Sequence, residues 1–410
     1  MTSFFTAEFF IQNRRRLRQK ISGQTPIVVA ANGLLQRGGD STYSFSQDAN
    51  FWYLTGIDEP DLILVIEADA EYLIVPERDA SRTTFDGALD DHAVTERSGI
   101  TLILETAAGW KRLQGALDAT KTVAMIAVPP PYIERHGLFV NPARGRLAEQ
   151  LQAAVPGVVV EDIALQLIHM RMLKQKPELQ ALQAAITITL ASIKAATTAT
   201  KLAGYTHEYQ LEAEITRGFR TRGAQGHSFE PIVAGGKRAC TLHNIANNDA
   251  LSAGELVVVD VGAEVEHYAA DITRTVAVGL PSARARAVHA AVADVQQYAF
   301  GLLKPGVLIG QYEKQIETYM GRALQRLGLI ATDDHEAIRQ YYPHATSHFL
   351  GLNVHDVGDY ELPLQPGMVL TVEPGIYIPQ EAIGVRIEDD VLITHTGIKI
   401  LSRRLSGQLK

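Results

Sequence analysis

The strongest constraint on the fold is a β-hairpin that places two carboxylates face to face. In the segment LVVVDVGAEVEHYAADITRT, Asp260 and Asp271 lie in two β-rich runs separated by turn-like residues. A tight turn at Val265 and Glu266 pairs residues whose numbers sum to 531, as 260 and 271 do. Like charges at facing positions destabilise a strand pair unless a positive charge lies between them. In this register, the hairpin predicts a site for a cation.

A second hairpin repeats the arrangement nearer the C-terminus. In GMVLTVEPGIYIPQEAIGVRIEDDVLIT, Glu373 and Glu388 face each other about a turn at Gln380 and Glu381. The alternative interpretation is that all four acids are exposed strand residues, where most Asp and Glu lie. Against it, Asp260 and Glu373 both follow apolar runs with the pattern of a buried strand. Because burying an uncompensated carboxylate is costly, burial implies a bound cation or protonation.

Histidines add nitrogen donors to these four carboxylates. His344, His348 and His355 lie close together in YYPHATSHFLGLNVHDVGDY, and His243 lies earlier, in TLHNIANN. A lone histidine is often structural, but three together favour a site. Oxygen ligands with one or two imidazoles suit divalent manganese, iron, cobalt or zinc, and four acids balance the charge of two such ions. We expect two divalent metal ions, with Mn²⁺ preferred and Zn²⁺, Co²⁺ or Fe²⁺ as alternatives.

Several other catalytic classes lack their motifs. The chain contains no G-x-x-x-x-G-K-[ST], G-x-G-x-x-G or G-x-S-x-G sequence. His-Glu pairs at 207–208 and 335–336 begin like the zincin motif, but Leu211 and Arg339 replace its second histidine. Cys240, the single cysteine, is more typical of a small buried apolar group than of a thiol nucleophile. A zincin is excluded, and the nucleotide-binding and serine-hydrolase classes are disfavoured.

Composition and charge narrow the broad class. A chain of 410 residues exceeds what one hydrophobic core usually organises, so we expect two domains. Its 46 acidic and 38 basic residues give a net charge of −8, which argues against a nucleic-acid partner. No apolar run approaches the ~18 residues of a membrane span, and one cysteine cannot form an internal disulfide. We expect a cytoplasmic protein with no membrane partner.

The pattern of elements changes near residue 170. Before it, β-rich runs alternate with helical stretches, which predicts an α/β domain over 1–168. These runs lie at 26–31, 62–68, 72–76, 122–128 and 157–162. After it, long helices and hairpin-joined strands predict an α+β domain over 169–410. Its helices are expected at 177–204, 206–222, 281–303 and 309–327, and its β runs at 256–261, 268–278, 368–373 and 384–394.

The chain resembles the pita-bread metallopeptidases, and among them the aminopeptidase P family of Xaa-Pro aminopeptidases. The matching strings are HSFEPIVAGG, TLHNIANN, VVVDVGAEVEHYAADITRT, TSHFLGLNVHDVG, GMVLTVEPGIY and GVRIEDD, which together span 227–390. The string DSTYSFSQDANFWYLTG, at 40–56, is similar to a signature of the family's N-terminal domain. The resemblance implies a pita-bread fold for the second domain, peptide substrates with proline in the second position, and a homodimer or homotetramer.

The resemblance also implies which residues hold the metals. Asp260 would ligate one ion, while His348 and Glu373 would hold the other. Asp271 and Glu388 would bridge both ions. Two ions ~3.5–4 Å apart would lower the pKa of a bridging water, and the resulting hydroxide would attack the peptide carbonyl.

Four further residues would act around the metals. His243 and His355 would line the substrate site and stabilise charge on the scissile carbonyl or the leaving nitrogen. His344 and Arg386 would hold the neighbouring site residues in position. Glu373, besides holding a metal, would move the proton.

Three alternatives stand beside this interpretation. A prolidase, which cleaves only Xaa-Pro dipeptides, can share both domains and all five ligands. Prolidases of the human type carry an Arg between the H-D-V-G and P-G-M-V-L-T strings, whereas here that segment, GDYELPLQ at 358–365, has two acids and no Lys or Arg. A non-catalytic pita-bread binding protein would usually have lost ligands, and all five are present. A methionine aminopeptidase would lack the N-terminal domain and the VHDVG string.

Overall fold

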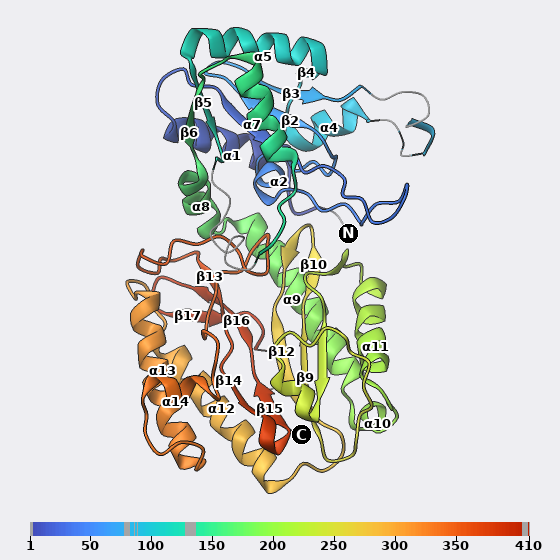
Figure 1. Ribbon diagram of the computed structural model, residues 1–410, viewed down its shortest axis with the longest axis vertical. Coiled ribbons are helices and arrows are strands. Elements are labelled where there is room, and N and C mark those ends of the chain that lie inside the picture. The colour runs from blue at the N-terminus through green and yellow to red at the C-terminus, as the bar shows by residue number, and fades with distance from the viewer. Residues whose placement is uncertain are drawn as a thin grey trace. The chain divides into compact units, whose positions relative to one another are not determined.

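The computed structural model describes residues 3–77, 83–85, 87, 89–127, 137–403 and 409, and Figure 1 traces the chain. The chain divides into two compact units, an N-terminal one of Phe5–Met170 and a C-terminal one of Arg171–Lys410 with Met1–Phe4. The predicted domain boundary after residue 168 falls inside helix α8, Ala164–Met172.

The N-terminal unit is built on a six-stranded mixed sheet with the order β4-β3-β2-β1-β5-β6. Strand β2 pairs antiparallel with β1 and β3, and the other neighbours are parallel. The strands are β1 (Ile27–Ala30), β2 (Ile63–Ile66), β3 (Glu71–Val75), β4 (Ile103–Glu105), β5 (Thr122–Met125) and β6 (Val159–Asp162). The helices are α1 (Ala7–Lys20), α2 (Ala49–Thr55), α4 (Asp91–Ser98), α5 (Thr106–Thr120) and α7 (Ala143–Ala154). The predicted α/β class is confirmed.

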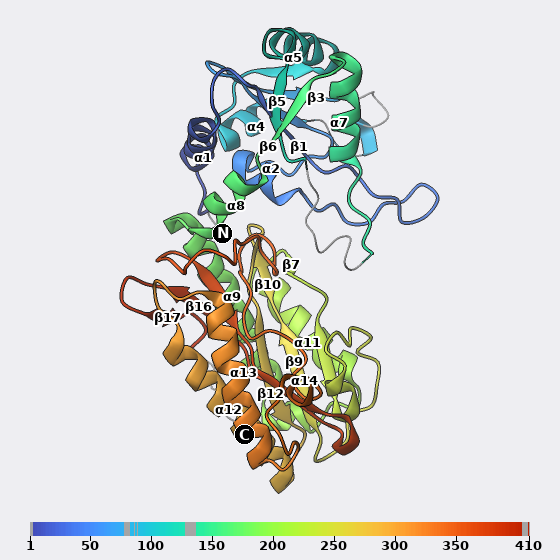
Figure 2. The same ribbon diagram turned by 60° about the vertical axis from the view of Figure 1, so that its left-hand side comes forward.

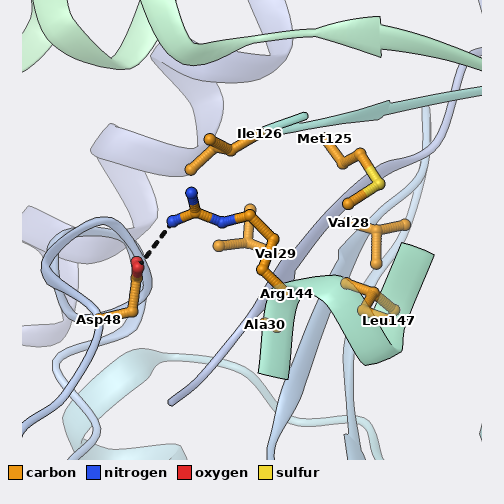
Figure 3. Close-up of a pocket in the computed structure, with 8 residues that line it drawn as sticks. All are labelled: Val28, Val29, Ala30, Asp48, Met125, Ile126, Arg144 and Leu147. Carbon is orange, nitrogen blue, oxygen red and sulfur yellow. Dashed lines mark hydrogen bonds and ion pairs between the residues drawn. The ribbon is translucent and has the colours of Figure 1, made fainter. Parts of the chain in front are cut away.

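The core of this unit lies between the sheet and helices α5 and α7. Strand residues such as Val28 and Tyr72 pack with Leu113 of α5 and Leu147 of α7, and all four are nearly inaccessible to solvent. Burying one apolar side chain of this size contributes about 1.5–3 kcal/mol to the stability of the folded state. A small pocket at this interface contains Arg144, which pairs with Asp48 at 3.0 Å (Figure 3). Its volume of about 10 Å³ suits a water molecule at most.

The C-terminal unit combines two groups of helices with several small antiparallel sheets (Figure 2). Helices α9 (Lys176–Ala196), α10 (Ala199–Leu202) and α11 (Glu208–Thr221) come first, and α12 (Ala283–Leu302), α13 (Ile309–Arg326) and α14 (His335–Arg339) follow the first strands. The strands are β7 (Gly226–His227), β8 (Ile232–Gly235), β9 (Leu256–Val261), β10 (Ala263–Val265), β11 (Tyr268–Ala269), β12 (Ile272–Ala277), β13 (Val369–Val372), β14 (Gly375–Ile378), β15 (Ile383–Arg386), β16 (Asp389–Ile393) and β17 (Ile398–Ile400). Helix α9 packs against α11 and β10, and α12 packs against α13 and β15. The predicted α+β class is confirmed.

Helix α9 is the central helix of this unit. It begins with a capping box between Gln175 and Glu178, and Pro177 lies in its first turn. The helix ends at Ala196 instead of continuing to residue 204, because Thr198 caps the separate short helix α10. By length and composition α9 could cross a membrane, but 56% of its apolar window is buried inside the protein. It is the core helix of a folded unit.

The first acidic hairpin has a different register from the predicted one. Its turn lies at Glu266 and His267, both with positive φ angles, and not at residues 265 and 266. Asp260 therefore faces Thr273. Asp271 lies two positions before Thr273 and so is the diagonal neighbour of Asp260. Because the register shift is even, both carboxylates stay on the same face of the hairpin.

The second acidic hairpin has the predicted register. Gly375 pairs with Arg386, and Val372 pairs with Asp389, so Glu373 and Glu388 lie opposite each other between these pairs. The connection is longer than two residues, because a 3₁₀ turn at Pro379–Glu381 precedes the left-handed Ala382. The longer loop leaves the pairing of the two carboxylates unchanged.

Candidate active site

A cavity of about 580 Å³ lies in the C-terminal unit. Apolar side chains form part of its wall, among them Phe229, Leu242, Ile245 and Val354. Every site residue predicted from the sequence also lines it: Asp260, Asp271, Glu373, Glu388, His243, His344, His348, His355 and Arg386. The structure thus brings together residues from segments more than a hundred positions apart.

The four acids lie at or beside the ends of paired strands. Asp260 is the penultimate residue of β9, and Asp271 directly precedes β12. This part of the hairpin needs a glycine at 262, because a Cβ there would lie 1.7 Å from the carbonyl oxygen of Ala270. Strand pairing through the backbone therefore places Asp260 and Asp271 close together at this end of the hairpin.

Three side chains converge as a candidate metal cluster. Donor atoms of Asp271, His348 and Glu388 all lie within 4.8 Å of one another. The Nε2 atom of His348 is 3.4 Å from Asp271 and 3.4 Å from Glu373. Its Nδ1 atom donates to the carbonyl oxygen of Phe349 at 3.0 Å, which leaves the Nε2 lone pair directed to the acids. This tautomer is the one a metal requires.

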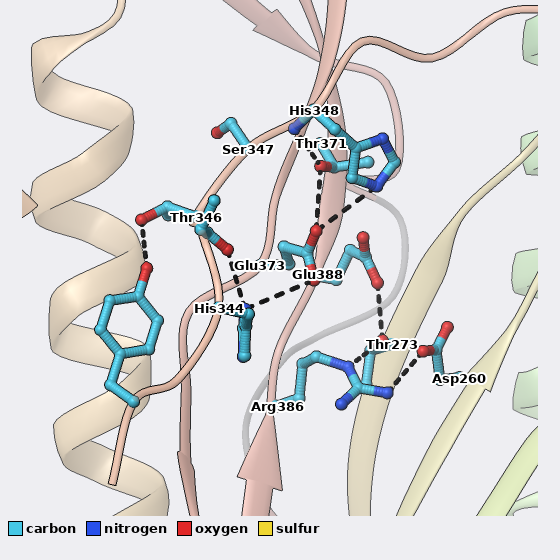
Figure 4. A network of polar contacts seen from close by, with 12 residues as sticks. Asp260, Thr273, His344, Thr346, Ser347, His348, Thr371, Glu373, Arg386 and Glu388 are labelled. Carbon is cyan, nitrogen blue, oxygen red and sulfur yellow. Dashed lines mark hydrogen bonds and ion pairs between the residues drawn. The ribbon is translucent and has the colours of Figure 1, made fainter. Parts of the chain in front are cut away.

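Two carboxylate oxygens of the four acids have no hydrogen-bond partner among the described residues. One carboxylate oxygen of Asp260 accepts from Arg386 at 2.5 Å, and one of Glu388 accepts from Thr273 at 2.6 Å (Figure 4). The other oxygen of each, Oδ1 of Asp260 and Oε1 of Glu388, is buried and unpaired. A buried acceptor without a partner is rare and costly. Divalent metal ions fit this donor set, since they would satisfy both oxygens and balance the charge.

The acids destabilise one another's charged forms. Burial first, and then the neighbouring carboxylates, raises the pKa values of Asp271 and Glu388 well above their ordinary range. Burial also raises the pKa of Glu373 to about 7, although His348 and Arg386 oppose the shift. The cluster therefore retains protons at pH values where isolated carboxylates are ionised, unless a cation replaces them.

We expect the metal-free protein to lose stability as the pH rises from about 5 to 8. A carboxyl group with a raised pKa stabilises the folded state below its unfolded pKa, and this contribution disappears as the pH passes its folded pKa, which is about 7 for Glu373. Bound metal would compensate the ionised carboxylates, so the metal-loaded protein should change less over this range. Melting temperatures at pH 5.5 and 8.0, with and without metal, test this. Equal slopes for the two forms would contradict it.

Arg386 connects Asp260 to His344 through Tyr377. Besides Asp260, its guanidinium donates to the hydroxyl of Tyr377 at 3.0 Å. Tyr377 in turn contacts Nε2 of His344 at 2.8 Å. Burial, and next the charge of Arg386, lowers the pKa of His344 to about 3, so this imidazole is neutral. The resulting chain from acid to arginine to tyrosine to histidine fixes the orientation of all four side chains.

His355 and His243 line the cavity beside the candidate metal cluster. The ring of His355 lies 4.3 Å from that of His348, measured between centroids. Burial first, and then His348 and His243, lowers the pKa of His355 to about 4. At neutral pH, His355 is therefore a neutral imidazole that can donate or accept a hydrogen bond.

Sequence reasoning missed Tyr377 and Glu313. Tyr377 ends the string GMVLTVEPGIY, but nothing in the sequence alone shows that it reaches His344. Glu313, on α13, accepts hydrogen bonds from the backbone N–H groups of Thr346 and Ser347, at 2.9 and 3.1 Å. It thereby holds the loop between His344 and His348. Glu313 lies in an amphipathic helix far from any matching string, so the sequence carried no signal for it.

Comparisons with known proteins are consistent with this site. Residues 180–395 match metallopeptidase family M24, and residues 10–124 match the aminopeptidase P N-terminal domain. An Xaa-Pro aminopeptidase of Haemophilus influenzae is 33% identical over 98% of this chain and 95% of its own. The structure of aminopeptidase P from E. coli in its low-pH form is 30% identical, with a TM-score of 0.86 over 98% of this chain and 96% of its own. A zinc-substituted E. coli aminopeptidase P in complex with product, also 30% identical, has a TM-score of 0.84 over the same shares.

Proposed function

Because this chain belongs to metallopeptidase family M24 and carries an aminopeptidase P N-terminal domain, we propose that it removes the first residue from peptides whose second residue is proline. That it is a metal-dependent hydrolase follows from its family and its Xaa-Pro aminopeptidase relatives. The observation that carries the proposal is the single cavity that gathers five metal-donor side chains and three further histidines.

We propose that Asp260 would hold one ion and that His348 and Glu373 would hold the other. Asp271 and Glu388 would serve as ligands to both ions. The two orphaned carboxylate oxygens and the clustered donors of Asp271, His348 and Glu388 support this assignment. When bound, the two ions supply polarisation of the scissile carbonyl and a water of lowered pKa.

The remaining steps use the chain's own side chains. Glu373 would take a proton from the attacking water and deliver it to the leaving nitrogen. This delivery matters for an Xaa-Pro bond, because its nitrogen is a tertiary amide without an N–H. His243 and His355 border the cavity as hydrogen-bond partners for the developing charge, and His344 and Arg386 hold the surrounding groups in place.

The charges of the cavity favour peptides longer than two residues. A dipeptidase must bind the carboxylate of proline, for which a bidentate Arg is the usual solution. Among the described residues that line the cavity, Arg386 is the only Lys or Arg. It is already engaged by Asp260, Tyr377 and Thr273. A longer peptide has an amide at this position and needs no such cation.

The metal, the assembly and the compartment are also proposals. Mn²⁺ suits four carboxylates with one imidazole, because oxygen donors favour it over softer ions, although Zn²⁺, Co²⁺ and Fe²⁺ are compatible. We propose a homodimer or homotetramer on the basis of the family resemblance. A cytoplasmic location agrees with a chain whose only cysteine, Cys240, is free.

Substrate length is tested by comparing Xaa-Pro with Xaa-Pro-Yaa at equal concentrations of metal-loaded protein. We expect the tripeptide to have the higher kcat/KM. A dipeptide with a kcat/KM tenfold or more above that of its tripeptide, equivalent to about 1.4 kcal/mol, would instead identify a prolidase. Failure to cleave either peptide, with two metal ions bound, would favour a non-catalytic binding protein.

A further inference from the structure

A buried ionic cluster lies directly behind the His355 loop. Asp356 follows His355 in the chain and accepts from Arg171 at 2.5 Å and from Lys174 at 3.0 Å. All three side chains are at most 2% exposed. Lys174 also donates to the carbonyl oxygen of Arg171 at 2.7 Å, so the two cations are held relative to each other.

The cluster holds Asp356 as an anion in a fixed position. Burial alone would raise its pKa, but Arg171 and Lys174 outweigh that effect, and the pKa of Asp356 is lowered. A buried carboxylate that remains ionised depends strongly on the geometry of its partners, because losing one leaves a charge uncompensated. Small displacements of Asp356 are therefore resisted.

The loop that carries His355 is closed tightly against this cluster. A Cβ at Gly351 would lie 2.0 Å from a carboxylate oxygen of Asp356 and 2.6 Å from Nζ of Lys174, so only glycine fits. The backbone N–H of Asp356 donates to the carbonyl oxygen of Phe349 at 2.8 Å. The segment before His355 is thus held against Asp356, the residue next to it.

We propose that Arg171 and Lys174 are positioning residues that act through Asp356 to hold the imidazole of His355 in the cavity. The inference rests on the proposed role of His355 at the substrate. Arg171 and Lys174 lie in the interval between the two segments that match known families, 10–124 and 180–395. Residues outside both matched segments thereby contribute to the geometry of the active site.

Lys174→Met tests the proposal first. It leaves Asp356 paired with Arg171, and the buried Glu178, whose charge Lys174 also offsets, can take up a proton because burial already raises its pKa. We expect kcat to fall by roughly 10–100-fold, which is typical when a partner that orients an active-site group is lost. KM and metal content should stay within about twofold of wild type. Arg171→Lys, which keeps the charge, should retain most of the activity that Arg171→Met loses.

Arg14→Met is the matched control in the N-terminal unit. Arg14 is fully buried and pairs with Glu71 at 2.6 Å, so its loss removes a comparable buried cation. We expect a lower melting temperature with kcat unchanged. If Arg14→Met lowered kcat as much as Lys174→Met does, general destabilisation would account for both effects and the proposal would be overturned.

A double-mutant cycle separates positioning from a purely structural role. If Lys174 acts through His355, then adding Lys174→Met to His355→Ala should change kcat by less than about twofold. Additive effects, or a loss of metal in proportion to the loss of activity, would overturn the proposal. Gly351→Ala, which displaces Asp356 without removing a charge, should reproduce the lowered kcat and the same lack of additivity.

The cycle also distinguishes this proposal from the one on which it rests. If His355→Ala alone kept wild-type kcat, the role of His355 would be wrong and nothing could act through it. If His355→Ala lowered kcat and Lys174→Met lowered it further by its full amount, only the positioning role of Lys174 would be wrong.

Discussion

Replacing Asp271 with alanine is expected to remove both metal binding and turnover. Asp271 is the acid whose donor atom lies with those of His348 and Glu388, and its raised pKa arises from burial among negative charges. If Asp271 contacts both ions, as proposed, its neighbours cannot replace it. Because metal ions contribute several kcal/mol to such reactions, we expect turnover to fall by roughly 10³-fold or more.

Metal content by mass spectrometry and kcat on an Xaa-Pro peptide should be measured on the same Asp271→Ala sample. His348→Ala, which under this proposal would remove a ligand of one ion only, should be no more severe. Glu381→Ala serves as the control, because this acid lies on the hairpin loop in a surface pair with Arg284 and should affect neither quantity. Wild-type metal content together with a wild-type rate in Asp271→Ala would refute the bridging role.

Replacing His355 with alanine should lower kcat by about 10²–10⁴-fold while sparing the metals. Its neutral ring borders the cavity beside His348 but lies outside the ligand cluster. An oriented donor or proton-transfer partner typically contributes this much to the rate. His243 also lines the cavity and lies outside the ligand cluster, so we expect an effect of the same kind from His243→Ala.

The measurement is kcat together with metal stoichiometry for His355→Ala. His335→Ala is a suitable control, since His335 is an exposed histidine on α14 that pairs with Glu317. We expect the control to match wild type in both quantities. A loss of metal that parallels the loss of activity would show that His355 is a ligand.

The sequence predicted the residues of the site better than their exact pairing. Apolar runs that end in acids identified Asp260 and Glu373, because burial and charge are visible in the local pattern. The register of the first hairpin was wrong by two positions. Glu266 and His267 adopt the left-handed conformation that hairpin turns favour, but neither is the Asn-Gly or Asp-Gly pair that signals it.

Strand β4 and the contacts between distant elements could not be predicted from the sequence. Strand β4 has only three residues and no buried run, so its pattern was too weak to predict. The contacts of Glu313 with the loop at 346–347, and of Lys174 with Asp356, join elements that only the tertiary fold brings together. Local periodicity has no information about such pairs, whereas it described most strands of the N-terminal unit.

The most direct test of the two-metal account is a titration of chelator-treated protein with Mn²⁺, followed by bound metal per chain and hydrolysis of an Xaa-Pro-Yaa peptide. The account predicts no turnover without metal, and full turnover only when two ions are bound per chain. Full turnover in the metal-free protein, or saturation of both binding and activity at one ion per chain, would contradict it.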